Sequence, residues 1–171
     1  MGALQIRGVG PKMKALHLIS HGPEQTQRLG TQLAELAQGG DVFFLCGSLG
    51  TGKTCLTQGI AWGLGVEEYA FSPSFVIARE YCGRLPLYHI DLYRLDRIEE
   101  VMDLGLDDYF RHDSVCVVEW AENGMAVLPK ENLLVRLGHM SDTERSLSLE
   151  PKGKRYSQLL TSLRLDLETW S

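Results

Sequence analysis

The sequence predicts a single-domain α/β fold with three layers, in which helices cover a mixed, mainly parallel central sheet that includes an antiparallel hairpin. Its 171 residues suit one domain with its own core, and 44% of them are hydrophobic against 23% that are charged, as in ordinary globular proteins. Short apolar runs of strand length alternate with segments that repeat leucine at helical spacing. This alternation is typical of α/β layers.

The first half of the chain predicts an edge strand, a helix, a buried strand and a second helix. A loose, glycine-rich arm is expected over residues 1–13, so the domain proper is expected to cover 14–171. Pro23 can open the first helix, because the N–H that it lacks is not needed in a first turn. Gly39 and Gly65 are expected to stop the two helices. These elements are expected at residues 15–19, 23–38, 42–46 and 53–64.

The second half predicts further strands and a closing helix. A hairpin is expected around residues 82–84, since two strand-like runs flank this short polar turn. Short helical pieces broken at Gly105 are expected to follow, and leucines at helical spacing near the C-terminus predict the last helix. The expected strands are 75–81, 85–90, 115–118, 133–137 and 146–149, and the helical segments are 98–109 and 156–167.

A glycine-rich stretch between the expected strand 42–46 and the helix after it carries the clearest chemical signal. Residues 47–54 read Gly-Ser-Leu-Gly-Thr-Gly-Lys-Thr and fit the P-loop pattern G-x-x-x-x-G-K-[ST] without a mismatch. Such a loop wraps a phosphate with backbone N–H groups, while the lysine reaches the β- and γ-phosphates and the hydroxyl ligates Mg²⁺. We therefore expect a P-loop NTPase; the alternative is a glycine-rich turn without a ligand. The expected nucleotide contacts are Ser48, Leu49, Gly50, Thr51, Gly52, Lys53, Thr54 and Cys55.

Two carboxylates end apolar strands downstream of this loop. Asp91 closes the run Leu-Tyr-His-Ile-Asp, and Glu119 closes Val-Cys-Val-Val-Glu. A magnesium ion held by Thr54 needs carboxylate help, direct or through water, so Thr54, Asp91 and Glu119 are the candidate metal residues. Lys53, Asp91 and Glu119 are the candidate catalytic residues. The alternative is that each acid is a solvated loop charge.

Three residues near these acids are candidates for the rim of the site. His89 shares a strand face with Asp91 by the two-residue period of a strand, although it also suits a satisfied, partly buried histidine. Arg94 is a candidate for contact with phosphate or a partner, and a surface salt bridge is the alternative. Trp120 follows Glu119 directly and is expected to lie at the site or to pack at its edge.

A short loop after the second helix has the character of a switch. Its position between that helix and the next strand suits a segment that senses the γ-phosphate, and an ordinary turn is the alternative. The loop consists of Ser72, Pro73, Ser74 and Phe75.

Charge, cysteine content and the length of the apolar runs indicate the kind of partner and the compartment. The net charge of −5 argues against a protein that grips nucleic acid by itself, because phosphate neutralisation needs basic residues. Cys46, Cys55, Cys82 and Cys116 form no C-x-x-C pair, and scattered thiols suit a reducing cytoplasm. No apolar run approaches membrane-spanning length, so no membrane contact is expected. No pattern assigns a role to the basic stretch 152–155.

Taken in order, these motifs resemble the TsaE family, also called YjeE. The resemblance covers about residues 26–124 and rests on the motifs at 47–54, 72–75, 89–94 and 118–122. It implies a small ATPase of tRNA threonylcarbamoyladenosine modification that uses ATP/ADP and Mg²⁺ and acts with TsaD and TsaB. It also implies that the loop at Ser72 is a switch. The tRNA would be met only through those partners. Ser74 and Thr51 depart from the family pattern, which usually has Thr and often Ala there.

Other functions remain open on the residues alone. A small-molecule kinase would use the same loop but usually has an arginine-rich lid, and the arginines here are scattered. A GTPase is disfavoured because the guanine-reading Asn-Lys-x-Asp element is absent. A nucleotide-gated binding module with negligible turnover is the third alternative.

Overall fold

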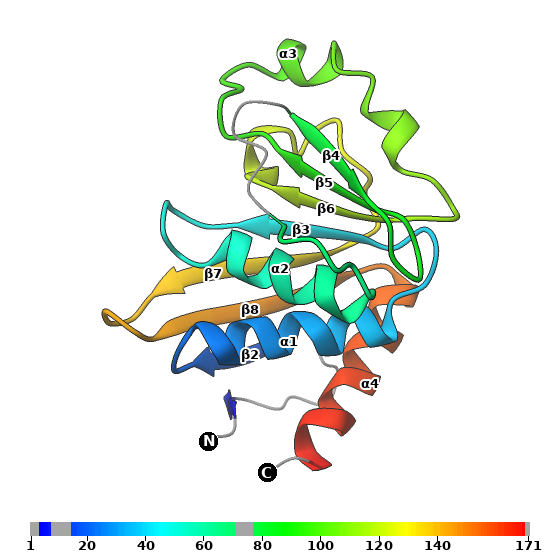
Figure 1. Ribbon diagram of the computed structural model, residues 1–171. Helices are drawn as coiled ribbons and strands as arrows, with labels where there is room; N and C mark the ends of the chain where they lie inside the picture. The colour runs from blue at the N-terminus through cyan, green and yellow to red at the C-terminus, as the bar shows by residue number, and fades with distance from the viewer. Residues whose placement is uncertain (1–3, 8–14, 71–76, 170–171) are drawn as a thin grey trace.

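The computed structural model describes residues 4–7, 15–70 and 77–169. They form one eight-stranded sheet in the order β1-β2-β8-β7-β3-β6-β5-β4, with helices packed on it (Figure 1). The strands are β1 (Gln5–Arg7), β2 (Leu16–Ser20), β3 (Val42–Cys46), β4 (Ala78–Tyr81), β5 (Leu87–Asp91), β6 (Val115–Glu119), β7 (Asn132–His139) and β8 (Arg145–Lys152). The α-helices are α1 (Pro23–Leu36), α2 (Lys53–Gly63), α3 (Ile98–Met102) and α4 (Lys154–Thr169), and the 3₁₀ helices are η1 (Leu106–Tyr109) and η2 (Ala121–Asn123).

The sheet is mixed and contains the expected hairpin, but the prediction that it is mainly parallel is wrong. Of the described strands, only four adjacent ones run parallel, in the pairs β7–β3, β3–β6 and β6–β5. The pairs β1–β2, β2–β8, β8–β7 and β5–β4 are antiparallel. The reason lies in the connections: β7 and β8 are joined by a short turn, which allows only antiparallel pairing, whereas parallel neighbours need a long crossover.

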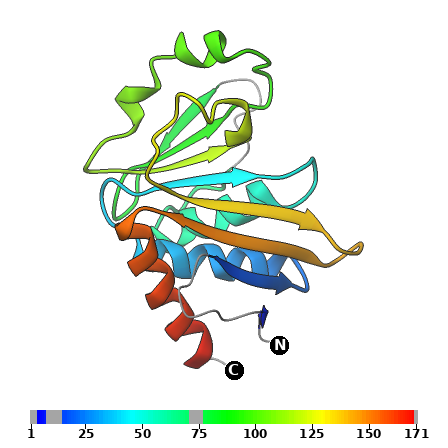
Figure 2. The same ribbon diagram turned by 180° about the vertical axis from the view of Figure 1, so that it is seen from behind.

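The three expected layers are present over the central strands. Successive residues of β3 point into two different apolar clusters, as the alternation of a strand requires. Phe43 and Leu45 pack with the leucines of α1, α2 and α4 on one face. Val42 and Phe44 pack with Val101 and other side chains from the α3, η1 and η2 region on the opposite face. Seen from behind, β7, β8 and β2 have no helix of the described chain across them (Figure 2).

Close packing of α1 against α2 determines where the glycine-rich loop lies. A Cβ at Gly59 would collide with the backbone of Gln27, and one at Gly30 would lie 2.5 Å from the carbonyl oxygen of Leu56. Glycine at both positions therefore lets the two helix backbones touch. As a result the first turn of α1 reaches the start of α2, where Cys55 Sγ donates to Pro23 O at 3.4 Å.

Most predicted elements are confirmed, with two differences. The strand expected at 15–19 is β2, but it is not the edge, because β1 pairs outside it; residues 5–7 of the expected loose arm thus belong to the sheet. The helix η2 was not predicted. The switch-like loop at Ser72 lies outside the described residues. No helix of the described chain is long and apolar enough to cross a membrane.

The basic stretch 152–155 has a structural role through its last residue. Arg155 Nε donates to Asp41 Oδ1 at 3.0 Å, and Nη2 donates to Asp41 Oδ2 at 2.7 Å and to Leu36 O at 2.8 Å. Asp41 is only 3% exposed, so the arginine ties the start of α4 to the end of α1 and to the residue before β3. The adjacent carboxylate raises the pKa of Arg155 above its ordinary value.

We expect Arg155→Ala to lower the free energy of unfolding by about 2–3 kcal/mol, because it leaves a buried carboxylate without its charged donor. Urea unfolding would measure this. Arg111→Ala is the control: its ion pair with Asp113 is about half exposed on both sides, so water screens it and the midpoint should hardly move. Equal losses in the two variants would contradict the role given to Arg155.

Candidate functional site

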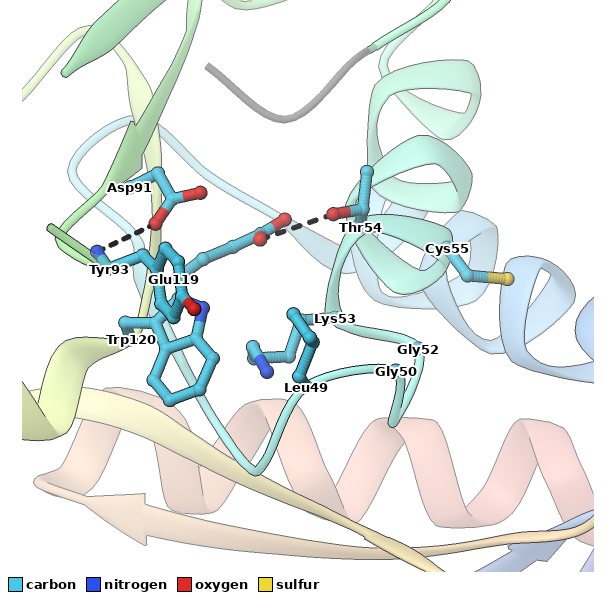
Figure 3. A pocket seen from close by; sticks show the side chains of 10 residues that line it. All are labelled: Leu49, Gly50, Gly52, Lys53, Thr54, Cys55, Asp91, Tyr93, Glu119 and Trp120. Carbon is cyan, nitrogen blue, oxygen red and sulfur yellow. Dashed lines mark hydrogen bonds between the residues drawn. The ribbon is translucent and has the colours of Figure 1, made fainter. Parts of the chain in front are cut away.

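The glycine-rich loop, residues 47–54, connects the carboxyl end of β3 to the first turn of α2 (Figure 3). Its backbone turns at Gly50, with φ 76°, and at Gly52, with φ 99°, a left-handed region that favours glycine. Thr51 is fully buried, and its hydroxyl donates to Ser48 O at 2.9 Å. The buried Thr51 side chain thus ties the loop together from inside.

Lys53 lies within the loop with its amino group turned toward the loop carbonyls. Its Nζ donates to Gly47 O at 2.6 Å and to Ser48 O at 2.9 Å, and it lies 4.1 Å from the centre of the Trp120 ring. Burial lowers the pKa of Lys53, while nearby Glu119 acts in the opposite direction. The amino group therefore lies buried at the floor of the loop, where it donates to two backbone carbonyls.

The two candidate acids meet beside the loop because their strands are parallel neighbours. Asp91 and Glu119 are register partners at the carboxyl ends of β5 and β6. Glu119 points toward α2, where Thr54 Oγ1 donates to its Oε2 at 3.2 Å (Figure 3). This hydrogen bond joins two of the predicted metal-binding residues, Thr54 of the loop and Glu119 of β6.

Two buried side chains hold Glu119 from behind. Thr57 Oγ1 donates to Glu119 Oε1 at 3.1 Å, and His89 Nε2 lies 3.0 Å from the same oxygen. His89 is fully buried, so its expected place at the rim is wrong: it lies beneath Glu119. The strand period correctly predicted its face but could not predict its depth.

Asp91 and two aromatic side chains form the opposite wall. Asp91 Oδ1 accepts from Tyr93 N at 2.9 Å. The Tyr93 and Trp120 rings pack with centres 4.8 Å apart. Trp120 has φ 56°, a strained value for a bulky residue, and this turn directs its ring over Lys53.

These residues enclose a cleft of about 390 Å³. Tyr93 lines it together with most of the predicted residues: Leu49, Gly50, Gly52, Lys53, Thr54, Cys55, Asp91, Glu119 and Trp120. Ser48 and Thr51 support the loop and do not line the cleft. Arg94 is exposed and does not line it either. Ser72, Pro73, Ser74 and Phe75 lie outside the described residues.

A second hollow of about 330 Å³ lies beside the same loop. It shares Gly50, Gly52 and Cys55 with the first cleft, and the start of α1 and the turn between β7 and β8 complete it. That turn contacts the loop: Arg145 Nη2 donates to Gly50 O at 3.3 Å, and His139 Nε2 lies 3.2 Å from Leu49 O.

Sequence reasoning missed Thr57, Tyr93 and the turn between β7 and β8. Thr57 stands one helical turn after Lys53, so helical spacing would have placed it near the loop. Tyr93 stands two residues after Asp91. For the turn we find no local signal, because only the pairing of β7 with β3 brings it to the loop.

The donor set suits a magnesium ion that takes further ligands from phosphates and water better than a metal ion held by protein side chains alone. Thr54 and Glu119 offer hard oxygen ligands side by side, and Asp91 lies on the adjacent strand. Over the described ranges there is no group of three or more His, Cys, Asp or Glu side chains placed to hold a metal. Mg²⁺ commonly takes one or two protein oxygens and completes its shell with phosphates and water.

The comparison with known families agrees with this arrangement. The family described as "Threonylcarbamoyl adenosine biosynthesis protein TsaE" matches residues 20–147, from β2 into β8. The chain belongs to the TsaE family. The match includes the loop, both acids and the helix that carries Thr57, and so confirms the resemblance carried by the motifs.

Individual TsaE relatives match most of the chain. A Bacillus subtilis protein named tRNA threonylcarbamoyladenosine biosynthesis protein TsaE is 43% identical over 152 residues, which is 88% of this chain and 95% of the relative. A Streptomyces coelicolor protein of the same name is 40% identical over 77% of this chain and 93% of its own. A crystal structure of YdiB from Bacillus subtilis superposes with a TM-score of 0.79 at 39% identity, covering 90% of this chain and 96% of that one.

Proposed function

We propose that this TsaE-family protein is a P-loop ATPase that serves tRNA threonylcarbamoyladenosine modification as an accessory factor. The observation that carries the proposal is the convergence of Lys53, Thr54 and Glu119 on one cleft, with the Thr54 hydroxyl 3.2 Å from Glu119. A cation, a hydroxyl and a carboxylate around a glycine-rich loop are the groups that bind a magnesium–triphosphate.

The loop and the amino terminus of α2 would hold the phosphates. Backbone N–H groups there point out of the helix and carry its positive partial charge. The amino group of Lys53 would exchange its bonds to Gly47 O and Ser48 O for oxygens of the β- and γ-phosphates. The low polarity around this buried lysine strengthens each such contact.

Thr54 and Glu119 would hold the magnesium ion, with Asp91 close enough to take part directly or through water. Bound magnesium would neutralise charge on the β- and γ-phosphate oxygens. Glu119 would accept a hydrogen bond from the Thr54 hydroxyl and so keep the Thr54 oxygen turned to the metal. Asp91, anchored by Tyr93 N, would orient the attacking water or the groups around it.

The nucleoside end of ATP would extend into the second hollow. Cys55 N follows Thr54 in the first turn of α2, where an α-phosphate lies, and Cys55 lines both cavities. Asp142 and Thr143 in the turn between β7 and β8 are the polar side chains there that suit a ribose or a base.

The transfer of the threonylcarbamoyl group would belong to the partners, TsaD and TsaB. ATP binding would favour association with this pair, and hydrolysis would reset the complex, because the ligand acts only through its different affinity for the two states. The net charge of −5 supports leaving tRNA contact to the partners, and four free cysteines support a reducing compartment.

Turnover and association together test the proposal. Alone, the protein should hydrolyse ATP well below the roughly 1–100 s⁻¹ of dedicated kinases, because the described chain presents no arginine among the residues that line the cleft. Pull-downs with a TsaB–TsaD pair should recover more protein with ATP than with ADP or without nucleotide.

Two results would replace the proposal. Phosphoryl transfer to a metabolite, with no association in any nucleotide state, would favour a small-molecule kinase. Nucleotide-dependent association with no hydrolysis, even in the complete complex, would favour a nucleotide-gated binding module.

A further inference from the structure

The two carboxylate oxygens of Glu119 accept hydrogen bonds from different parts of the molecule. Among the described residues, Oε1 meets both Thr57 and His89, whereas Oε2 meets Thr54. Thr54 lines the cleft, but Thr57 and His89 lie behind it and are fully buried. One carboxylate oxygen is therefore bound by the protein interior, and the other faces the cleft.

The contact with His89 determines where the imidazole carries a proton. A carboxylate oxygen only accepts hydrogen bonds, so Nε2 must carry the hydrogen that it donates to Oε1. The other ring nitrogen, Nδ1, is buried without a hydrogen-bond partner in the described chain. Nε2 thus donates to Glu119, while the buried Nδ1 makes no hydrogen bond within the described chain. A buried nitrogen without a hydrogen bond costs free energy, and functional sites tolerate such a cost.

Thr57 acts on the same oxygen from the helix. Its hydroxyl lies 3.0 Å from Lys53 O and 3.1 Å from Glu119 Oε1, and its one proton can serve only one of them at a time. The charged carboxylate is the stronger acceptor, and Lys53 O is already within the hydrogen-bonding pattern of α2. A donor in the helix and a donor in the sheet thus converge on Oε1.

We propose that Thr57 and His89 are positioning residues that bind Oε1 of Glu119 and so present Oε2 to the Thr54 hydroxyl and the magnesium ion. The proposal rests on the proposed binding of magnesium–nucleotide. A carboxylate held at one oxygen cannot turn away when the metal arrives, so less rotational freedom is lost on binding. Outer partners of this kind typically change metal affinity by about 10–100-fold.

Two matched pairs of variants test this. Thr57→Val removes the hydroxyl at nearly constant shape, and Thr57→Ser keeps it. His89→Leu removes the donor, and His89→Gln keeps an N–H near the position of Nε2. The readout is the affinity for ADP, measured by titration calorimetry in EDTA and again in Mg²⁺, so that it does not depend on turnover.

Thr57→Val and His89→Leu should lower the gain in ADP affinity from Mg²⁺ by about 10-fold or more, while ADP affinity in EDTA stays unchanged. Thr57→Ser and His89→Gln should restore most of that gain. Thr31→Val is the control, because the acceptors near its hydroxyl in the described chain are Gln27 O and Gly59 O, at the contact between α1 and α2 and away from Glu119. It should behave like the unsubstituted protein.

A double-substitution cycle tests whether the effect passes through Glu119. In a Glu119→Gln background, adding Thr57→Val should cost little further magnesium affinity, because the oxygen that Thr57 positions has already lost its charge. Additive losses would overturn the proposal. So would an unchanged magnesium gain in both single variants, or equal losses with and without Mg²⁺. A Thr57→Val protein that fails to fold would give the hydroxyl a structural role and also count against it.

The outcome separates this inference from the proposed function. If the unsubstituted protein binds no ADP, the proposed function fails first. If it binds ADP more tightly with Mg²⁺ and the four variants do the same, only the positioning role fails.

Discussion

Lys53→Ala should reduce ATP hydrolysis by about 10²–10³-fold, since it removes a fixed positive group from the place where the transferred phosphate develops charge. Nζ of Lys53 is the side-chain cation that lies within the loop, 2.6 Å from Gly47 O, and no other Lys or Arg of the described chain lines the cleft. ATP affinity should fall too, because the same contact exists in the bound ground state. Phosphate release and ATP titration would measure both effects.

The fold should survive this substitution. Among the described residues, the lysine donates hydrogen bonds only to carbonyls of its own loop, so the free energy of unfolding should change by about 1 kcal/mol. Lys130→Ala, at an exposed lysine outside the cleft, is the control and should leave turnover unchanged. Normal ATP hydrolysis by a folded Lys53→Ala protein would refute the assignment of the loop.

Glu119→Gln should produce a different defect, centred on magnesium. Glutamine keeps the shape but offers one acceptor oxygen where the carboxylate now accepts from Thr54, Thr57 and His89 through two. At least one donor therefore faces an NH₂ group. We expect the gain in nucleotide affinity that Mg²⁺ provides to fall by about 10–100-fold. ADP titrations with and without Mg²⁺ would measure this.

Asp91→Asn is the matched comparison on the neighbouring strand. It should lower kcat by about 100-fold and leave ATP affinity nearly intact, if Asp91 orients water and not the bound nucleotide. Equal losses of affinity alone in both variants would show that the division of roles between the two acids is wrong.

Local features of the sequence were sufficient for much of this structure. The strand at 42–46, the loop at 47–54 and the helix after it are contiguous, so their patterns predict both the elements and the proposed chemistry. Asp91 and Glu119 were also predictable as a pair. Each ends an apolar strand, and the carboxyl ends of parallel strands lie at one edge of a sheet.

The outer half of the sheet was not predictable in the same way. Apolar alternation identifies β2, β7 and β8 as strands but does not give the direction in which they pair. The short turn between β7 and β8 forces antiparallel pairing and carries His139 and Arg145 to the loop. The prediction of a mainly parallel sheet failed at this point.

Neighbouring residues and motifs in a fixed order were enough to predict the glycine-rich loop, the order of most helices and strands, and the family. The surroundings of Glu119, by contrast, depend on contacts between distant parts of the chain. His89 and Thr57 are 30 and 62 residues away from it in the chain, and they meet it because β5 pairs with β6 while α2 packs across them. Strand periodicity gave the face of His89, but its depth depends on how neighbouring elements cover that face, which no local pattern encodes.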